Sequence, residues 1–466
     1  MTASNTSAER SISAILTQFV ATGCWEAIPA AAKHEAKRAL LNFFAVSMAG
    51  CGDPTIIIAA RVFGEFAANQ QASIIGSGKR SDILNASALN AMSANVFDFD
   101  DTHLPTIIHP TAPIAPVVFS LTERSTMSGR DVLTAFILGI EVACRIGNAI
   151  SPAHYARGWH ITSTCGIFGS AMAAGKVLGL DASSLRWALG HASSQASGLV
   201  ETIGTMAKSA GVGAAARNGL LSALLAQQGF AGPDYPLEGE RGFLRVMGDK
   251  PDMASIISGL GARWEILRNT YKPYPCGVVL NPVIEGCLDL FRRNDMTADE
   301  LAAVTEIEVT SHPLLRERAD RPGVRTGREA QVSAQHAIAV SLLYGKAGLA
   351  QFSDDAVADP AVRAIGKKVR FIDDDRIPLT ATKLRLLRPD ALAITSVVEA
   401  ARGSADKPMT DKELEDKLRE ICRNSSADYD PEPLISAVWS LDENNDAGML
   451  MRLTRLNRET SHTPCL

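Results

Sequence analysis

The chain has 466 residues, of which 46% are hydrophobic and 21% are charged, and its formal net charge is −5. This composition is ordinary for a globular enzyme built from two or three domains, or from one large core with an inserted unit. The small negative charge gives no sign of the basic surface that nucleic acid requires, so we expect no nucleic-acid partner.

Cysteine spacing and apolar segments indicate the compartment. The eight cysteines stand at positions 24, 51, 144, 165, 276, 287, 422 and 465, with no C-x-x-C pair. That spacing favours free thiols over a disulfide framework or a metal site. No apolar signal core follows the polar N-terminal residues, and Glu141 and Arg145 interrupt the most apolar stretch, near 131–149. We therefore expect a cytoplasmic protein that does not bind membranes.

Helices are predicted throughout the first part of the chain. Pro29 is placed to begin a helix that Gly50 ends, and Asp181 is placed to cap another. The predicted helices span 12–19, 30–49, 53–68, 83–96, 114–122, 131–149, 166–178, 183–196 and 200–210, and a further one ends at 228. No convincing strand is predicted before residue 262.

The pattern changes near residue 262. Residues 305–310 alternate, with Ile307 and Val309 on one face and glutamates on the other, as in a half-buried strand. Further strands are predicted at 264–267, 368–372, 383–387 and 393–398, and helices at 278–292, 329–344, 411–422 and 431–456. The predicted fold is therefore mainly α: a large all-helical domain (1–262 and 403–466) with a smaller inserted α+β lid domain (263–402).

Residues 97–113 combine acidic, hydroxyl and imidazole groups in a segment stiffened by prolines. Pro105, Pro110 and Pro113 forbid a continuous helix here. The polar residues, which we judge too polar to belong to the core, are Asp98, Asp100, Asp101, Thr102, His103 and His109. A rigid polar loop between buried helices is a common place for catalytic groups, so this loop is predicted to form one wall of an active site. The alternative is a capped helix end followed by a surface loop.

Three further polar breaks carry reactive side chains. They are the turn from Tyr155 to His160, the isolated Lys208, and the segment from Tyr271 to Cys276, which contains Lys272 and Tyr274. Imidazoles and lysines suit the movement of a proton at a carbon next to a carboxylate, because they neutralise the substrate and stabilise the enediolate-like charge. Structural alternatives exist: Lys208 as a surface lysine with a buried stem, and His160 as a core histidine.

The segment Gly211 to Ala216 matches the loose dinucleotide fingerprint G-x-G-x-x-A. It follows no apolar strand and lies in a helical run, so close helix packing through glycine is the preferred interpretation.

At these residues the chain resembles the MmgE/PrpD family. The resemblance rests on Asp98-Phe-Asp-Asp-Thr102 with His109-Pro110, on Arg157-Gly-Trp-His160, on Lys208 in its Gly/Ala-rich setting, and on Tyr271-Lys-Pro-Tyr-Pro-Cys276. It implies a helical domain with an α+β lid, a cleft between them as the active site, no cofactor and a homodimer. It also implies catalytic or substrate-binding roles for Asp98, Thr102, His109, His160, Lys208 and Lys272.

Within the family, the resemblance favours a cofactor-independent epimerase of an iminodisuccinate-like dicarboxylate. In this hypothesis His109, His160 or a lysine removes the α-proton, and Lys272 or Tyr155 returns one from the opposite face. Lys208 holds the carboxylates together with the expected substrate-binding residues Thr102, Asp101, His103 and Tyr274.

Two alternatives remain. The first is a lyase of the same family, of the 2-methylcitrate dehydratase or cis-aconitate decarboxylase type. Asn281 is evidence against the lyase, because the family often has a histidine at this position. Without that histidine, this chain lacks an acid that could protonate the leaving group. The second is a non-enzymatic helical scaffold.

Overall fold

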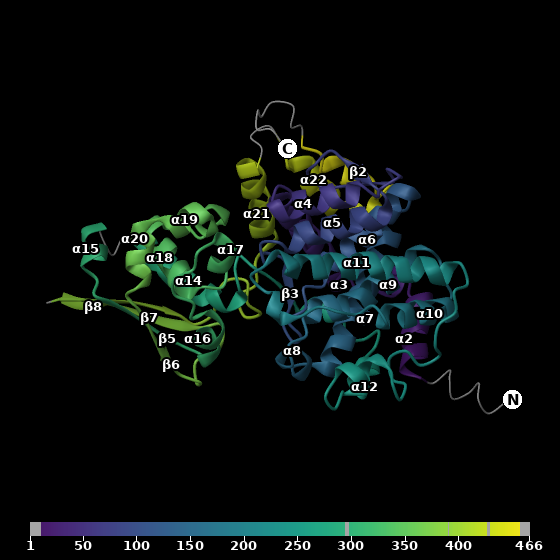
Figure 1. The fold of residues 1–466 in the computed structure, drawn as a ribbon, viewed down its shortest axis with the longest axis horizontal. Coiled ribbons are helices and arrows are strands. Elements are labelled where there is room, and N and C mark those ends of the chain that lie inside the picture. Colours follow the sequence, from purple (N-terminus) through teal and green to yellow (C-terminus); the bar gives the residue numbers. More distant parts are fainter. Residues whose placement is uncertain (1–10, 294–297, 390, 426–428, 457–466) are drawn as a thin grey trace. The chain divides into compact units, whose positions relative to one another are not determined.

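The computed structural model describes residues 11–293, 298–389, 391–425 and 429–456, and it divides into two compact units. The first unit comprises the described parts of 1–96, 100–269 and 411–466, and the second comprises 97–99 and 270–410 (Figure 1). The predicted boundaries were 262/263 and 402/403. Residues 263–269 stay with the first unit because Glu265 and Asn269 hydrogen-bond to its side chains at Glu141 and Asp101.

The first unit is helical, which agrees with the mainly α fold predicted for the chain. Asp181 caps α10 as predicted, its carboxylate accepting from Ser184 N–H at 2.7 Å. The helices are α2 (Ile12–Thr22), α3 (Ala30–Gly50), α4 (Pro54–Gly64), α5 (Ile83–Asn95), α6 (Thr111–Arg124), α7 (Gly129–Ile150), α8 (Ala153–Ala156), α9 (Ile161–Val177), α10 (Ala182–Ser193), α11 (Met206–Gln227), α12 (Phe243–Met247), α13 (Met253–Ile257), α21 (Asp411–Ser425), α22 (Glu432–Trp439) and α23 (Met449–Leu453).

Small residues let these helices approach closely. A Cβ atom at Gly139 of α7 would lie 2.7 Å from the carbonyl oxygen of Gly169 in α9. A Cβ at Gly213 of α11 would lie 2.9 Å from the carbonyl oxygen of Ala88 in α5. Helix packing through glycine is thus confirmed for the segment that resembles a dinucleotide fingerprint.

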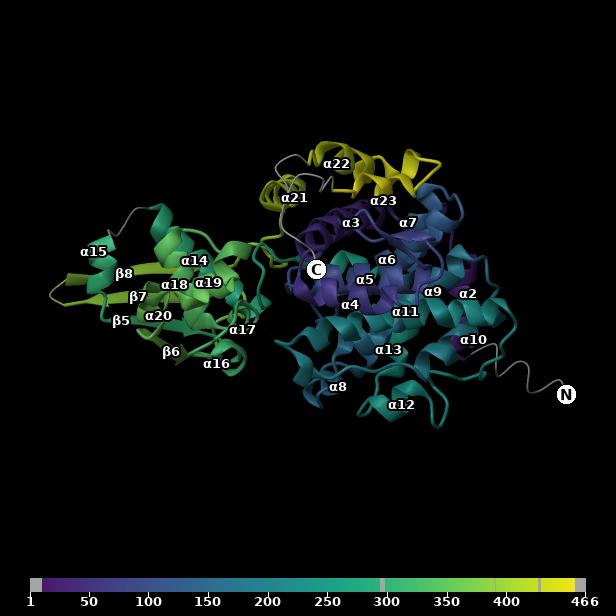
Figure 2. The same cartoon turned by 45° about the horizontal axis from the view of Figure 1, so that its top comes forward.

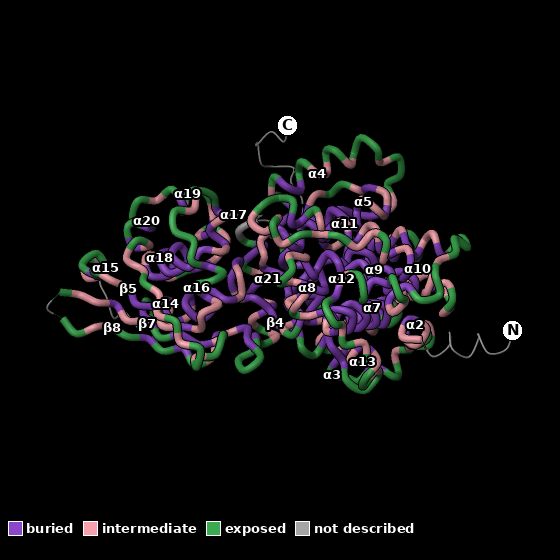
Figure 3. The backbone as a smooth tube through the Cα atoms, turned by 60° about the horizontal axis from the view of Figure 1, so that its bottom comes forward, coloured by how far each residue is buried: buried purple, intermediate pink, exposed green. Residues whose placement is uncertain are grey.

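Helix α7 forms the centre of the first unit, where Figure 3 shows its backbone as buried. By length and composition it could cross a membrane, but 94% of its most apolar stretch is buried inside the protein. Its apolar surface is therefore already used for packing.

The second unit packs helices on one face of a four-stranded sheet (Figures 1 and 2). The strand order is β6-β5-β7-β8, with β5 parallel to β6 and antiparallel to β7. The strands are β5 (Glu306–Ser311), β6 (Val369–Asp373), β7 (Thr382–Arg388) and β8 (Ala391–Val398). The helices are α14 (Asn281–Arg292), α15 (Ala298–Ala303), α16 (Pro313–Ala319), α17 (Gly327–Ala330), α18 (Ala334–Tyr344), α19 (Asp354–Ala358) and α20 (Pro360–Gly366).

The two faces of this sheet differ as the alternation in 305–310 predicts. Ile307 and Val309 are fully buried in the core of the second unit. On the other face Glu308 accepts from Arg370 of β6 and Arg385 of β7, which forms a row of ion pairs across three strands.

Two predictions about strands are corrected. Residues 264–267 do not form a strand, because Glu265–Arg268 is a 3-10 turn whose first residue is tied to Glu141. Strands do occur before residue 262, but each has only two or three residues, too few for a visible alternation. They are β1 (Ala72–Ser73), β2 (Arg80–Ser81) and β3 (Asp101–His103); β4 (Asn269–Tyr271) follows the turn.

The cysteines of the described chain are free thiols, as predicted, and all of these except Cys24 are buried. Cys465 lies outside the described residues.

Candidate active site

The polar loop leads from α5 to α6 and closes on itself in a tight turn. His103 N–H donates to the carbonyl oxygen of Ile108, and Ile107 N–H donates back to that of His103, each at 2.8 Å. The expectation that the loop's polar residues are too polar for the core is wrong for all of them except Asp98, which is half-buried. Asp101 and His103 are fully buried, and Asp100, Thr102 and His109 are nearly so. Groups of the protein bond to each of them, but among the described residues Asp100 Oδ1 and Asp101 Oδ1 have no hydrogen-bond partner.

His109 is held in one orientation by its backbone and by one ring nitrogen. Its N–H donates to Thr162 Oγ1 at 3.1 Å, and Nδ1 lies 2.7 Å from the carbonyl oxygen of Asp101. Since a carbonyl can only accept, Nδ1 carries the hydrogen, and the neutral imidazole has its lone pair on Nε2. Asp100 Oδ1 and Thr102 Oγ1 lie 3.4 Å from the same Nδ1.

Asp101 and Asp100 anchor the loop through neutral donors. Asp101 Oδ2 accepts from Thr111 Oγ1 at 2.6 Å and from Asn269 Nδ2 at 2.8 Å. Asp100 Oδ2 accepts from Asn95 Nδ2 at 2.7 Å. Burial raises the pKa of Asp101 to about 7, which these hydrogen bonds only partly oppose. The role of Asp101 in binding substrate stays a prediction; in this structure its Oδ2 bonds the protein and its backbone carbonyl orients His109.

His160 and Lys208 lie at the same end of two parallel helices. His160 is the residue before α9, and its Nδ1 lies 2.8 Å from Ser163 Oγ. A Cβ at Gly211 of α11 would lie 2.9 Å from that same Ser163 Oγ, and one at Gly219 would meet Ser170. Both helices therefore run in the same direction. Lys208, three residues before Gly211, lies at the level of His160, three residues before Ser163.

This placement decides between the alternatives for Lys208. The side chain is only 8% exposed, so the surface-lysine interpretation is wrong. The N-terminal ends of α9 and α11 carry partial positive charge, and together with Lys208 they favour an anion. His109 is tied to the first turn of α9 through Thr162, so the first unit brings His109, His160 and Lys208 to this region. Tyr155 lies half-buried in α8, five residues before His160.

In the second unit, Lys272 forms a buried pair with Asp98. Lys272 Nζ lies 2.9 Å from Asp98 Oδ2 and 2.9 Å from its carbonyl oxygen, and the lysine is 3% exposed. Asp98 adopts a φ of +51°, which is uncommon outside glycine and typical of functional or strained positions. The prediction that Lys272 and Asp98 act on the same substrate as the histidines of the first unit stays a prediction.

Tyr274 keeps its proton at neutral pH. Burial raises the pKa of its phenol to about 12, and the guanidinium of Arg402 lies 5.6 Å from the ring centre. Its hydroxyl accepts a long hydrogen bond of 3.4 Å from Arg402. As a group that binds substrate, Tyr274 could therefore only donate or accept a neutral hydrogen bond.

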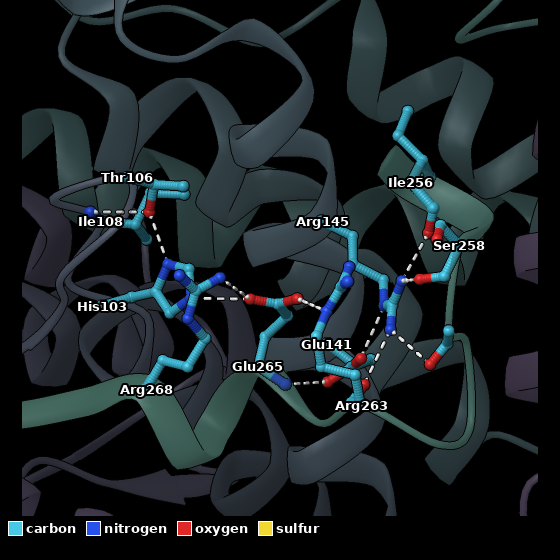
Figure 4. Close-up of polar contacts among 11 residues, drawn as sticks. His103, Thr106, Ile108, Glu141, Arg145, Ile256, Ser258, Arg263, Glu265 and Arg268 are labelled. Carbon is cyan, nitrogen blue, oxygen red and sulfur yellow. Dashed lines mark hydrogen bonds and ion pairs between the residues drawn. The ribbon is translucent and has the colours of Figure 1, made fainter. Parts of the chain in front are cut away.

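The role of His103 in binding substrate stays a prediction, and its ring already has two partners in the protein. Its Nε2 lies 3.1 Å from Glu265 and its Nδ1 2.8 Å from Thr106, so both ring nitrogens are engaged within the protein (Figure 4).

The sequence prediction missed the residues that hold the candidate catalytic groups. Thr162 and Ser163 lie two and three residues after His160, and hydroxyls at the start of a helix were a usable signal. Glu265 and Asn269 lie far from the loop in sequence and carry no motif, so no local pattern could have found them.

Comparisons with known proteins match the chain to one family over most of its length. Residues 14–255 match the model of the MmgE/PrpD N-terminal domain, and residues 274–443 match that of the MmgE/PrpD C-terminal domain.

Curated relatives are similar over most of their length. A cis-aconitate decarboxylase of Aspergillus terreus is 28% identical over 477 residues, which covers 96% of this chain and 97% of the relative. A cis-aconitate decarboxylase-like protein of Aspergillus oryzae is 27% identical, covering 97% of this chain and 99% of the relative. The human cis-aconitate decarboxylase is 26% identical, covering 91% and 90%.

Proposed function

Because the chain belongs to the MmgE/PrpD family, we propose that it is a lyase that decarboxylates an unsaturated tricarboxylate of the cis-aconitate type. The observation that carries the proposal is the similarity to cis-aconitate decarboxylases over more than nine-tenths of the chain. The comparisons support this lyase alternative better than the iminodisuccinate epimerase that the sequence favoured. An epimerase and a lyase share the need for stabilised negative charge on carbon, which is why local motifs separate them poorly.

The reaction defines what the protein must supply. When cis-aconitate loses carbon dioxide, the bond between the methylene carbon and its carboxylate breaks. The electron pair is delocalised through the adjacent double bond toward the carboxylate at its far end. One proton must then be added to carbon. The protein therefore has to hold the remaining carboxylates, stabilise the delocalised charge and deliver one proton.

Lys208 and the N-terminal ends of α9 and α11 are suited to hold carboxylates. Lys208 supplies an ammonium group, and each helix end supplies a partial positive charge. Water is largely excluded here, since Lys208 is 8% and His160 is 4% exposed. Thr102 adds a hydroxyl donor from the same loop. In the second unit Lys272 pairs with Asp98 at 2.9 Å, and its action on the same substrate is part of the proposal.

We assign proton delivery to His109. The carbonyl oxygen of Asp101 accepts from Nδ1–H whether the ring is neutral or protonated. The ring can therefore gain and lose its proton at Nε2 without losing its anchor. His160 is the partner for charge stabilisation, since Ser163 fixes its ring through Nδ1.

Three further properties are part of the proposal. The reaction needs no cofactor, the chain acts as a homodimer, and it works in the cytoplasm. Activity that survives exhaustive dialysis against a chelator, and the mass of the purified protein by light scattering, would test the first two.

The deciding experiment incubates the purified protein in deuterium oxide with cis-aconitate, 2-methylcitrate or an iminodisuccinate-like acid, followed by proton NMR and carbon dioxide release. We expect carbon dioxide from cis-aconitate and one deuteron on the product carbon. Inversion of the dicarboxylate without loss of mass would show an epimerase instead.

Two pairs of variants tie the activity to the assigned residues. His109→Gln is expected to lower kcat 10²–10⁴-fold. Its control is His336→Gln, because His336 is also buried with a ring nitrogen bonded to a carbonyl, that of Gln351.

Lys272→Met is expected to lower activity 10²–10³-fold. Its control is Lys417→Met, because buried Lys417 bonds Asn42 at 2.8 Å. Equal losses in variant and control would overturn the assignments.

A further inference from the structure

A fully buried arginine lies at the centre of the first unit. Each N–H of the Arg145 guanidinium has an acceptor in α7 or in the segment 256–263. Nε donates to Glu141 at 2.6 Å, and the terminal nitrogens donate to four carbonyl oxygens, those of Ile256, Ser258, Gly259 and Arg263 (Figure 4). This arrangement fixes the segment that leads to Glu265.

Glu265 continues the network toward the polar loop. Its backbone N–H donates to Glu141 Oε2 at 2.7 Å. Its carboxylate accepts from Arg263 at 3.1 Å, from Arg268 at 3.3 Å and from His103 Nε2 at 3.1 Å. Burial alone would raise the pKa of Glu265, but hydrogen bonds from His103, Asn148 and Arg263 outweigh it and lower the pKa to about 2. Glu265 is therefore ionised at neutral pH.

An ionised Glu265 sets the tautomer of His103. Burial lowers the pKa of His103, so the ring is neutral and donates Nε2–H to the carboxylate. Nδ1 must then accept, and it accepts the hydroxyl hydrogen of Thr106 at 2.8 Å. With its hydrogen so directed, the Thr106 oxygen can accept from Ile108 N–H at 3.3 Å. Each step fixes the direction of the next hydrogen bond.

The end of this chain of hydrogen bonds is a strained turn. Ile107 has a φ of +57°, a left-handed conformation that β-branched residues rarely adopt. Such a residue persists only where its surroundings hold it in place. The bonds between His103 and Ile108, together with Thr106, close the turn around Ile107. His109 follows two residues after Ile107, so the geometry of the turn sets where its ring begins.

We propose that Glu265 and His103 are positioning residues, which hold the Thr106–Ile108 turn and thereby set the orientation of His109. The role rests on the proposed function, in which His109 delivers the proton. It differs from a merely structural role because it predicts that loss of the carboxylate changes the His109 ring and the chemical step more than substrate binding.

Glu265→Gln tests the proposal with little change of shape. A glutamine can turn its amide toward His103, which admits the opposite tautomer of the ring and reverses the hydrogen bond to Thr106. We expect kcat to fall 10–100-fold with KM changed less than 2-fold, as for residues that orient a catalytic group. Nitrogen-15 NMR of the imidazoles, with the His109 signals assigned by loss in His109→Gln, should show altered His109 Nδ1 and Nε2 shifts.

Glu123→Gln is the matched control. Its carboxylate is also enclosed, accepting from Ser73 and Arg80, but it has no bond to the polar loop. It is expected to leave kcat and the His109 signals unchanged. Thr106→Val is the second test variant, which keeps the Glu265–His103 pair and removes only the last link. It should shift the His109 signals in the same direction, and it decides the matter if Glu265→Gln does not fold.

The NMR measurement needs no substrate, so it separates this proposal from the proposed function. Altered His109 signals in a protein that decarboxylates nothing would support positioning and count against the lyase. Unchanged His109 signals in the folded test variants, or a rise in KM without a fall in kcat, would overturn the positioning role.

Discussion

Asp101 and Glu265 are two fully buried carboxyl groups of the first unit, yet their affinities for a proton change in opposite directions. Burial raises the pKa of Asp101 to about 7, with the Thr111 hydroxyl opposing part of the rise. Burial acts on Glu265 in the same sense, but donors led by His103 lower the pKa to about 2.

The difference lies in the neighbours and not in the depth of burial. Asp101 has neutral donors, Thr111 and Asn269, and the carboxylate of Asp100 beside it. Glu265 has two arginines among its partners. The partners of Glu265 keep it ionised, whereas Asp101, with its neutral donors, holds a proton near neutral pH. One cation does not suffice, since burial raises the pKa of Glu141 to about 7 although Arg145 donates to it. Asp101 can therefore change its charge near neutral pH, whereas Glu265, which supports the Thr106–Ile108 turn, stays ionised.

Removing Arg145 should have the largest effect, because the Arg145 guanidinium holds the segment that leads to Glu265. Arg145→Met leaves the Glu141 carboxylate buried and four carbonyl oxygens without a donor. We expect a loss of about 3–5 kcal/mol in the free energy of unfolding, measured by urea denaturation. Arg316→Met, which breaks an exposed pair with Asp373, is the control and should leave the free energy of unfolding nearly unchanged.

Replacing Asp101 tests whether its carboxyl group changes charge near neutral pH. Its pKa in the folded protein is above the ordinary value of 3.8, so its contribution to stability is complete below pH 4 and is lost as the pH rises to about 7. The difference amounts to about 4 kcal/mol. In Asp101→Asn this pH dependence should disappear, so the variant gains stability relative to the wild type between pH 4 and pH 7. Urea titrations of the wild type and the variant across that range would measure this gain. A difference in the free energy of unfolding that is the same at every pH would contradict the comparison.

Glu265→Gln should show the opposite dependence. The pKa of Glu265 is lowered from 4.5 to about 2, so its contribution is present above pH 4.5 and is lost as the pH falls toward 2. We expect a deficit of about 3 kcal/mol at pH 7 that narrows below pH 4.5. Thermal unfolding at pH 7, 4.5 and 3 would measure it. A deficit that grows on acidification would mean that Glu265 is not the ionised partner.

Thr111→Val removes one neutral donor from Asp101 and should have the smallest effect. A hydrogen bond to an ionised carboxylate contributes about 1.5–3 kcal/mol, and one to a neutral carboxyl about 0.5–1.5 kcal/mol. The variant should therefore lose about 1 kcal/mol more at pH 8 than at pH 5, by the same urea titration. An equal loss at both values would show that Asp101 does not change its charge in this range.

Local signals predicted the elements well where they were long. The helix at 131–149, the Asp181 cap and the alternation of 305–310 each follow from rules that act within one element, and the structure contains them. The helices predicted at 200–210 and up to 228 are instead a 3-10 turn at Val200–Thr202 and one helix, α11. The prediction failed at 264–267, where apolar side chains suggested a strand. Glu265 is tied to Glu141, more than a hundred residues away, and this long-range bond selects a 3-10 turn.

The candidate site shows the same division. The histidines, Lys208 and Lys272 could be named from their residue types and their polar breaks between apolar elements. The order of their hydrogen bonds could not, because Thr162, Asn269 and Glu265 reach the loop only after the chain has folded. His103 illustrates the limit, since it shares the sequence context of His109 but is enclosed by Thr106 and Glu265.

By itself, the amino-acid sequence determined the mainly helical fold, the inserted α+β unit and the chemical inventory of the site, because periodicity, capping and residue type are local properties. Only the tertiary structure decided which buried groups are charged, which ring nitrogen of His109 holds the hydrogen, and that Lys208 and His160 lie at the same helix ends. Those properties depend on burial and on donors from distant segments, and the energy of a buried charge is set by neighbours that sequence order does not reveal.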